Sequence, residues 1–141
     1  SNRLILAYYG DTMKPLHFVA SSQKDLRDFP EEVRHEAGFA LYLAQQGEKS
    51  ANAVPMVGFK GAKVLEVVIT EDGDAYRAVY TVKFPKAIYV LHAFQKKSKK
   101  GDKTPQPDMR LIISRLKDAE AHYEGTYEQA QPREKRHERA S

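Results

Sequence analysis

The sequence predicts one α+β domain, with a twisted antiparallel sheet of about four strands, two N-terminal helices packed on one face and a C-terminal helix. A stretch from Leu65 to Lys100 is dense in β-branched and aromatic residues over strand-like lengths. Apolar residues recur every three or four positions from Ser22 to Gln46 and again after Pro105, as in helices with one buried side. At 141 residues the chain suits a single core.

The N-terminal part predicts a strand and two helices. Residues 1–14 are expected to be a leader, of which Ser1 and Asn2 could remain from cloning. A short strand is expected over Leu16–Ala20, followed by serines that favour a helix start. Pro30 divides the helical stretch into a short helix and a longer one, because proline suits a first helical turn. The buried stripe consists of Leu26, Phe29, Val33, Ala37, Leu41 and Ala44.

Residues 48–61 are expected to form a loop that leads into three consecutive antiparallel strands. Asp72-Gly73 is a hairpin signal, and a two-residue turn there sets Glu66 opposite Val79 and Val68 opposite Arg77. The same reasoning around Pro85-Lys86 sets Arg77 opposite Phe94 and Val79 opposite His92. Strand alternation then predicts two faces. The helix-covered face carries Leu65, Val67, Ile69, Tyr76, Ala78, Tyr80, Val82, Tyr89, Leu91 and Ala93, and the other carries Glu66, Val68, Arg77, Val79, Thr81, Val90, His92 and Phe94.

A final helix is predicted to open at Thr104-Pro105 and to end at Gly125. Its inner side is expected to consist of Met109, Ile112, Ile113, Leu116, Ala119 and Tyr123. The domain therefore spans residues 15–124. Residues 125–141 form a polar charged tail, which is expected to be mobile or to become helical on binding.

Composition excludes several classes of protein. The chain has no cysteine, no apolar run of membrane-spanning length, no glycine-rich nucleotide motif and no serine elbow. A reducing cytosol fits, and no cofactor is expected. Glu32 and His35 lack the second half of a carboxylate metal site, and His17, His122 and His137 are not expected to form a ligand cluster, so no metal is predicted. The net charge of +4 favours a polyanionic partner.

One face of the predicted sheet holds the candidate site. Arg77 and His92 lie within diagonal-neighbour reach on it, and a lysine-rich run follows from Lys96 to Lys103. Such a face could hold and cleave a phosphodiester. Plainer readings remain open: Arg77 could form an ion pair with Glu66, His92 could be a structural histidine, the lysines could be a solvated loop, and Phe94 could be core or a base-stacking platform.

The segments Tyr76-Arg77-Ala78-Val79-Tyr80-Thr81-Val82 and Tyr89-Val90-Leu91-His92-Ala93-Phe94-Gln95-Lys96-Lys97-Ser98 resemble the phage-derived gene-product-49-like family. These proteins belong with the HigB and RelE toxins of type II toxin–antitoxin modules. The similarity runs from about Leu16 to Tyr123. It implies a RelE-like fold, ribosome-dependent cleavage of mRNA in the cytoplasm, and neutralisation by a HigA-like helix-turn-helix antitoxin.

The resemblance also implies roles for single residues. Arg77 matches the phosphate-contacting strand arginine, His92 matches a catalytic or near-catalytic polar position, and Lys96 and Lys97 match the basic positions beyond it. Val57 and Val67 depart from the family pattern, which moves expected phosphate contacts to Lys60 and Lys63. The expected catalytic residues are thus Arg77, His92, Lys96 and Lys97, with RNA bound by Phe94, Lys60, Lys63, Lys99, Lys100 and Lys103. The alternatives are a non-catalytic RNA- or ribosome-binding module and an antitoxin-binding protein.

Overall fold

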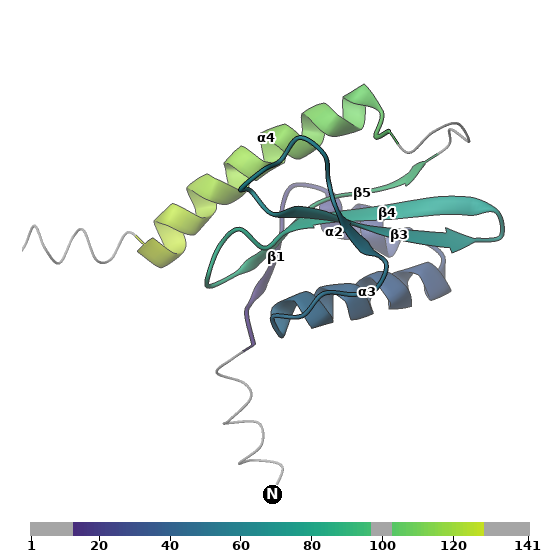
Figure 1. Ribbon diagram of the computed structural model, residues 1–141, viewed down its shortest axis with the longest axis horizontal. Coiled ribbons are helices and arrows are strands. Elements are labelled where there is room, and N and C mark those ends of the chain that lie inside the picture. Colours follow the sequence, from purple (N-terminus) through teal and green to yellow (C-terminus); the bar gives the residue numbers. More distant parts are fainter. Residues whose placement is uncertain (1–12, 97–102, 129–141) are drawn as a thin grey trace, which may run out of the picture.

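The computed structural model describes residues 13–96 and 103–128, which form a sheet with helices on both sides (Figure 1). In Figure 1, α3 lies below the sheet and α4 lies above it. The elements in chain order are β1 (Leu16–Phe18), α2 (Ser22–Arg27), α3 (Glu31–Gln45), β2 (Ala53–Pro55), β3 (Val64–Glu71), β4 (Asp74–Thr81), β5 (Ile88–Lys96), α4 (Gln106–Tyr123) and a π-helical segment, η1 (Glu124–Glu128). The α+β prediction is confirmed.

The sheet has five strands in the order β1-β5-β4-β3-β2. The short β1 pairs in parallel with β5, so the sheet is mixed rather than wholly antiparallel. The region predicted as loop over residues 48–61 contains β2, an antiparallel edge strand on β3. Three residues ending in proline carry too little pattern to predict a strand, and an edge tolerates the proline because its outer side needs no donor.

The hairpin between β3 and β4 follows the predicted register. Glu66 lies opposite Val79 and Val68 opposite Arg77. Asp72 and Gly73 both have positive φ, 51° and 82°, as a two-residue turn that matches the strand twist requires. On the other side of β4, Arg77 lies opposite Phe94 and Val79 opposite His92, also as predicted.

A β-bulge in β5 overturns part of the predicted face assignment. The register shifts between Val79 and Tyr80, so Tyr80 pairs with Val90 and Leu91 has no partner on β4. One extra residue reverses the alternation beyond it. Tyr89 and Leu91 therefore pack on the α4 side, and Val90 on the α3 side, each opposite to the prediction.

The first core lies between the sheet and α3. Val33, Ala37, Ala40, Leu41 and Ala44 are buried along one side of α3, in agreement with the predicted stripe. Three of these are alanines, whose small side chains let the helix approach the sheet closely. They pack on the strand residues Leu65, Val67, Ile69, Tyr76, Ala78, Tyr80, Ile88, Val90 and Ala93.

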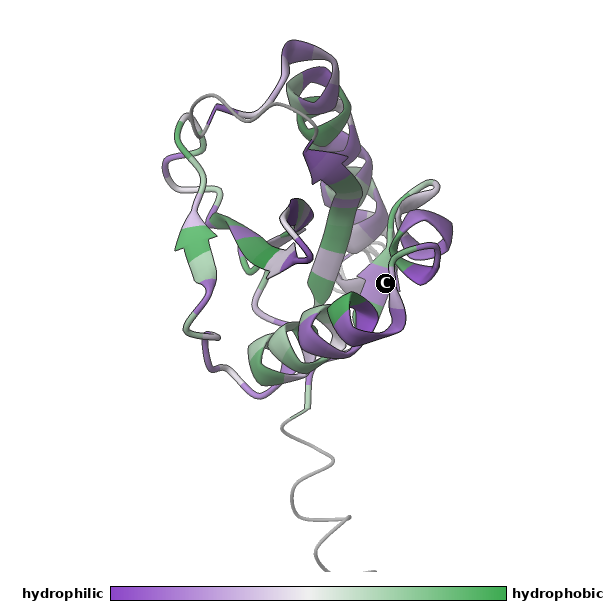
Figure 2. Ribbon diagram, turned by 90° about the vertical axis from the view of Figure 1, so that its right-hand side faces the viewer, coloured by the Kyte–Doolittle hydropathy of each residue, from purple (hydrophilic) through white to green (hydrophobic). Residues whose placement is uncertain are grey.

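The second core lies under α4, on the face that carries Arg77 and His92. Ile112, Leu116, Ala119 and Tyr123 are buried there, whereas Ile113 is 43% exposed and does not belong to the inner side predicted for it. In Figure 2 the strands are coloured mainly as hydrophobic, whereas the helices combine hydrophobic and hydrophilic residues. Gly125 does not end the helix but falls within η1. Within the residues described, no helix has the length and hydropathy to span a membrane.

Candidate functional site

The side chain of Arg77 is buried against a carboxylate. Arg77 is 6% exposed, Glu66 on the neighbouring strand is 4% exposed, and the Arg77 Nη1 atom donates to Glu66 Oε1. The two residues are diagonal neighbours across β3 and β4. Thr104, just before α4, donates its Oγ1 hydrogen to Glu66 Oε2 over 3.4 Å. The predicted ion pair is present, and the start of α4 is tied to it.

Arg77 also forms part of the wall of a cleft of about 690 Å³. The cleft lies between β2, β3, β4 and the first turn of α4, and its walls combine apolar and polar groups. They include Met56, Val57, Val68, Lys103 and Met109. Among the described residues, Arg77 Nε is a buried donor with no hydrogen-bond partner. A buried unsatisfied donor at a cleft wall is unusual and favours an acceptor group from a ligand.

His92 lies on the same face as Arg77, as predicted, and is enclosed by three neighbours. Its Nε2 atom lies 2.7 Å from Asp108 Oδ1, and its Nδ1 atom lies 3.2 Å from Arg115 Nη1. The ring stacks on Phe94, with centroids 4.8 Å apart and an interplanar angle of 18°. His92 is 5% exposed and Phe94 is 9% exposed. Both ring nitrogens are thus engaged by protein groups.

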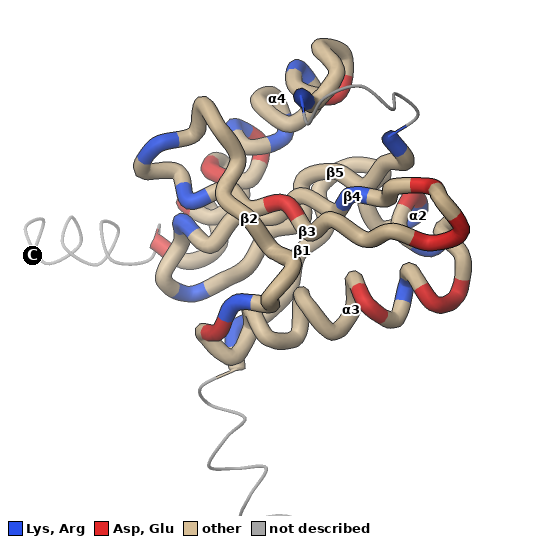
Figure 3. The backbone as a smooth tube through the Cα atoms, turned by 45° about the vertical axis from the view of Figure 1, so that its right-hand side comes forward, with Lys and Arg blue, Asp and Glu red and all other residues tan. Residues whose placement is uncertain are grey.

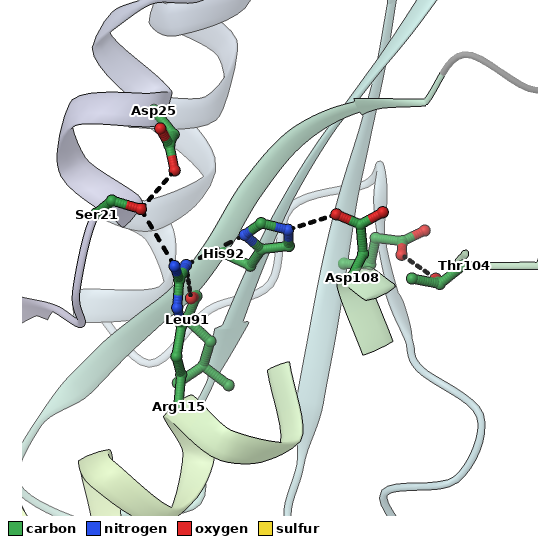
Figure 4. A network of polar contacts seen from close by, with 8 residues as sticks. Ser21, Asp25, Leu91, His92, Thr104, Asp108 and Arg115 are labelled. Carbon is green, nitrogen blue, oxygen red and sulfur yellow. Dashed lines mark hydrogen bonds and ion pairs between the residues drawn. The ribbon is translucent and has the colours of Figure 1, made fainter. Parts of the chain in front are cut away.

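Arg115 crosses from α4 to the bulge in β5 (Figure 4). Its Nη1 donates to the carbonyl oxygen of Leu91 over 3.0 Å, which satisfies a backbone group of the residue that the bulge leaves unpaired. Its Nη2 donates to Ser21 Oγ over 3.1 Å, and Ser21 in turn donates to Asp25 over 2.8 Å. One guanidinium therefore joins α4, β5 and the start of α2.

Among the described residues, the lysines predicted to bind RNA or to act in catalysis do not lie at one place. Lys103 is exposed and lines the cleft, whereas Lys60 and Lys63 are exposed just before β3 and do not line it. Lys96 ends β5 opposite Ala75 and is 7% exposed, so it is largely covered. Lys97, Lys99 and Lys100 lie outside the described residues.

One group of acidic side chains lies close to the Lys96 end of β5. Figure 3 shows acidic residues at the turn between β3 and β4 and along the first half of α3. A side-chain hydrogen bond with Glu32, and then the negative charge of Glu32, raise the pKa of Glu71. These carboxylates repel a polyanion.

The sequence that contains this site matches a known protein family. A family model described as "Phage derived protein Gp49-like (DUF891)" matches residues 24–117, which is more than half of the chain and runs from α2 into α4. The chain belongs to this Gp49-like family. Gp49-like proteins are associated with RelE-like toxins of toxin–antitoxin modules. Searches of curated proteins and of solved structures find no match. The matched region of this Gp49-like chain includes Arg77, His92 and Arg115.

Two residues of α4 that complete the site, Asp108 and Arg115, are not among the residues predicted from the sequence. The signal for Arg115 is its position between Ile112, Leu116 and Ala119 on the buried side of α4. A charged residue in an apolar stripe must find a buried partner, which makes it a candidate for a polar network.

A second polar cluster of the Gp49-like chain lies at the far end of α4. The rings of His17 and His122 are 4.8 Å apart. His17 bonds Tyr127 over 2.7 Å, and Tyr89 bonds His122 over 2.6 Å. Burial, and then the charge of His122, lower the pKa of His17, and burial raises the pKa of Tyr89 to about 12. Among residues 13–96 and 103–128, no three side chains gather that could hold a metal ion.

Proposed function

We propose that this chain is the toxin of a toxin–antitoxin module and acts in the cytoplasm as a metal-independent, ribosome-dependent mRNA endoribonuclease. The reaction is attack of a ribose 2′-hydroxyl on its own phosphate. It needs a group that takes the hydroxyl proton, cations for the charge on the phosphorane and a donor for the leaving oxygen. A HigA-like helix-turn-helix antitoxin is the proposed partner.

The observation that carries the proposal is the unsatisfied Nε of Arg77, a residue of the cleft wall. Glu66 holds the guanidinium through Nη1, and the covered Nε lacks the acceptor that a phosphate oxygen would supply. Arg77 is assigned to the transition-state charge. Lys103 on the same wall, together with Lys96 and Lys97, is assigned to the RNA backbone or the leaving oxygen.

His92 and Asp108 form the proton-transfer pair of the proposal. They lie at the first turn of α4, beside Thr104, which bonds the partner of Arg77 (Figure 4). The helix N-terminus at this turn adds positive potential, which favours a phosphate group nearby. Phe94 supports the His92 ring by stacking, so base stacking would need another group.

Testing this function requires variants that stay folded. Arg77→Ala alone leaves the Glu66 carboxylate buried without its cation, so loss of activity could reflect loss of fold. The double variant Glu66→Leu with Arg77→Met removes the pair and the phosphate donor together. Transcript ends are mapped after brief expression of the wild type, this double variant and Lys117→Gln, which removes an exposed charge of α4. Circular dichroism checks the fold.

The expected result is cleavage within translated messages by the wild type and by Lys117→Gln, with none by the folded double variant. Full cleavage by the double variant removes Arg77 from the mechanism. Incubation of purified protein with naked RNA and with translating ribosomes decides ribosome dependence.

A second candidate function is a non-catalytic RNA- or antitoxin-binding module. The burial of Arg77 and His92 favours it, because both are at most 6% exposed. Salt-sensitive RNA binding without cut products on ribosomes supports an RNA-binding module. Tight binding of the antitoxin alone supports the antitoxin-binding form.

A further inference from the structure

The hydrogen bonds around His92 determine which of its nitrogens carries the proton. A guanidinium only donates, so Arg115 Nη1 must donate to a lone pair on His92 Nδ1. Nδ1 is then unprotonated, and a neutral ring carries its hydrogen on Nε2. That hydrogen is donated to Asp108 Oδ1 over 2.7 Å. His92 therefore presents one occupied acceptor and one occupied donor, and neither nitrogen is placed to take a proton from a substrate.

Asp108 is the accessible member of the pair. Its side chain is 24% exposed, compared with 7% for His92. It lies in the first turn of α4, one residue before Met109, which lines the cleft, although Asp108 itself is not part of the cleft wall. In Figure 4 one oxygen of the Asp108 carboxylate faces the His92 ring. A carboxylate oriented by a buried histidine can accept a proton from a group that enters from the cleft.

We infer that Asp108 is the proton acceptor of the cleavage reaction and that His92 and Arg115 are positioning residues that hold it. This inference rests on the proposed function and adds the identity of the base. The 2′-hydroxyl gives its proton to the Asp108 carboxylate as the 2′-oxygen bonds to phosphorus. The bond from phosphorus to the 5′-oxygen breaks, and the leaving oxygen takes a proton from a lysine ammonium such as Lys103. The products are a 2′,3′-cyclic phosphate and a 5′-hydroxyl, and solvent restores both side chains.

The other charged groups that face the pair are few among the described residues. Arg115 bonds the ring directly, and Asp25 reaches Arg115 through Ser21. Glu66 and Arg77 lie on the neighbouring strands and connect to the first turn through Thr104.

Single-turnover cleavage on translating ribosomes from pH 4.5 to 8 tests the assignment. Asp108→Asn is expected to lower the rate at least 100-fold, the usual scale for loss of a positioned base. His92→Gln retains a side-chain N–H for Asp108 and is expected to lose less than 10-fold. Asp118→Asn, an exposed carboxylate on the same helix, is the matched control and should behave as the wild type.

Arg115→Met separates positioning from mere support of the fold. Without the arginine, His92 Nδ1 loses the donor that marks it as the acceptor nitrogen, so the single ring tautomer should be lost in nitrogen NMR while circular dichroism shows an unchanged fold. Nitrogen NMR of His92 in the wild type should report a neutral ring with hydrogen on Nε2, whether or not the protein cleaves RNA.

The outcomes distinguish failure of the proposed function from failure of the assignment of Asp108 as the base. A wild type that cuts no RNA overturns the proposed function and this assignment with it, while the NMR result still decides the ring geometry. A cleaving wild type together with a near-normal rate for Asp108→Asn overturns only the assignment of the base.

Discussion

Arg77 and Glu66 form a buried ion pair across β3 and β4, two residues out of direct opposition in the register that the Asp72-Gly73 turn sets. The pair sits under α4 and at the wall of the cleft, so it links the stability of the sheet to the chemistry of the site. Removing one partner and removing both have different physical consequences, which gives the first prediction.

Glu66→Ala should destabilise the domain by about 3–5 kcal/mol, because it leaves the Arg77 guanidinium buried without a countercharge. The double variant Glu66→Leu with Arg77→Met should be within about 1–2 kcal/mol of the wild type, since apolar residues of similar volume can replace a buried pair. Urea unfolding measures both. A double variant as unstable as Glu66→Ala would show that the ion pair stabilises the fold beyond the cost of leaving one charge buried and unpaired.

The buried hydroxyl of Tyr80 gives a second prediction. Tyr80 is fully buried, its hydroxyl has no hydrogen-bond partner among the described residues, and burial raises its pKa. Tyr80→Phe should therefore leave stability unchanged or raise it by about 1 kcal/mol. Tyr89→Phe is the matched control, because it loses a 2.6 Å bond to His122 and should cost about 1 kcal/mol. A loss of stability in Tyr80→Phe equal to that of the control would indicate an unseen partner.

The turn between β3 and β4 gives a third prediction. Gly73 has a φ of 82°, and a Cβ built there meets nothing within 4 Å, so Gly73→Ala should cost about 1–2 kcal/mol through backbone strain alone. Gly38 lies within α3 and also faces open space. Gly38→Ala should stabilise by about 0.5–1 kcal/mol through helix propensity. Thermal unfolding measures the two shifts, and shifts of the same sign would contradict the assignment of the turn.

A fourth prediction concerns pH. Because the pKa of His17 is lowered on folding from its ordinary 6.5, the unfolded chain binds more protons between the folded value and 6.5. The contribution of His17 to stability is complete above pH 6.5 and is lost as pH falls through the folded value. His17→Gln should reduce the loss of unfolding free energy between pH 7.5 and 5. His35→Gln, an exposed histidine on α3, serves as control, and equal slopes in all three proteins would contradict the prediction.

The parts of the site that depend on residues close together in the chain were predictable, and the parts that depend on distant segments were not. The shared face of Arg77 and His92 followed from two turns and strand alternation, and so did the possibility of the Glu66 pair. Asp108 and Arg115 did not follow, because their roles depend on where α4 lies. Lys60 and Lys63, expected from the family resemblance to replace lost phosphate contacts, do not line the cleft.

The sequence by itself determined the three-strand meander, the two helices divided at Pro30 and the register of the β3–β4 hairpin, because each depends on residues close together in the chain. Only the tertiary structure decided that α4 covers the face of Arg77, that β5 bulges at Leu91 and that β1 joins in parallel. An apolar helical stripe fits either face of a sheet equally well. Packing between distant segments makes the choice, and that packing surrounds His92 with Asp108 and Arg115.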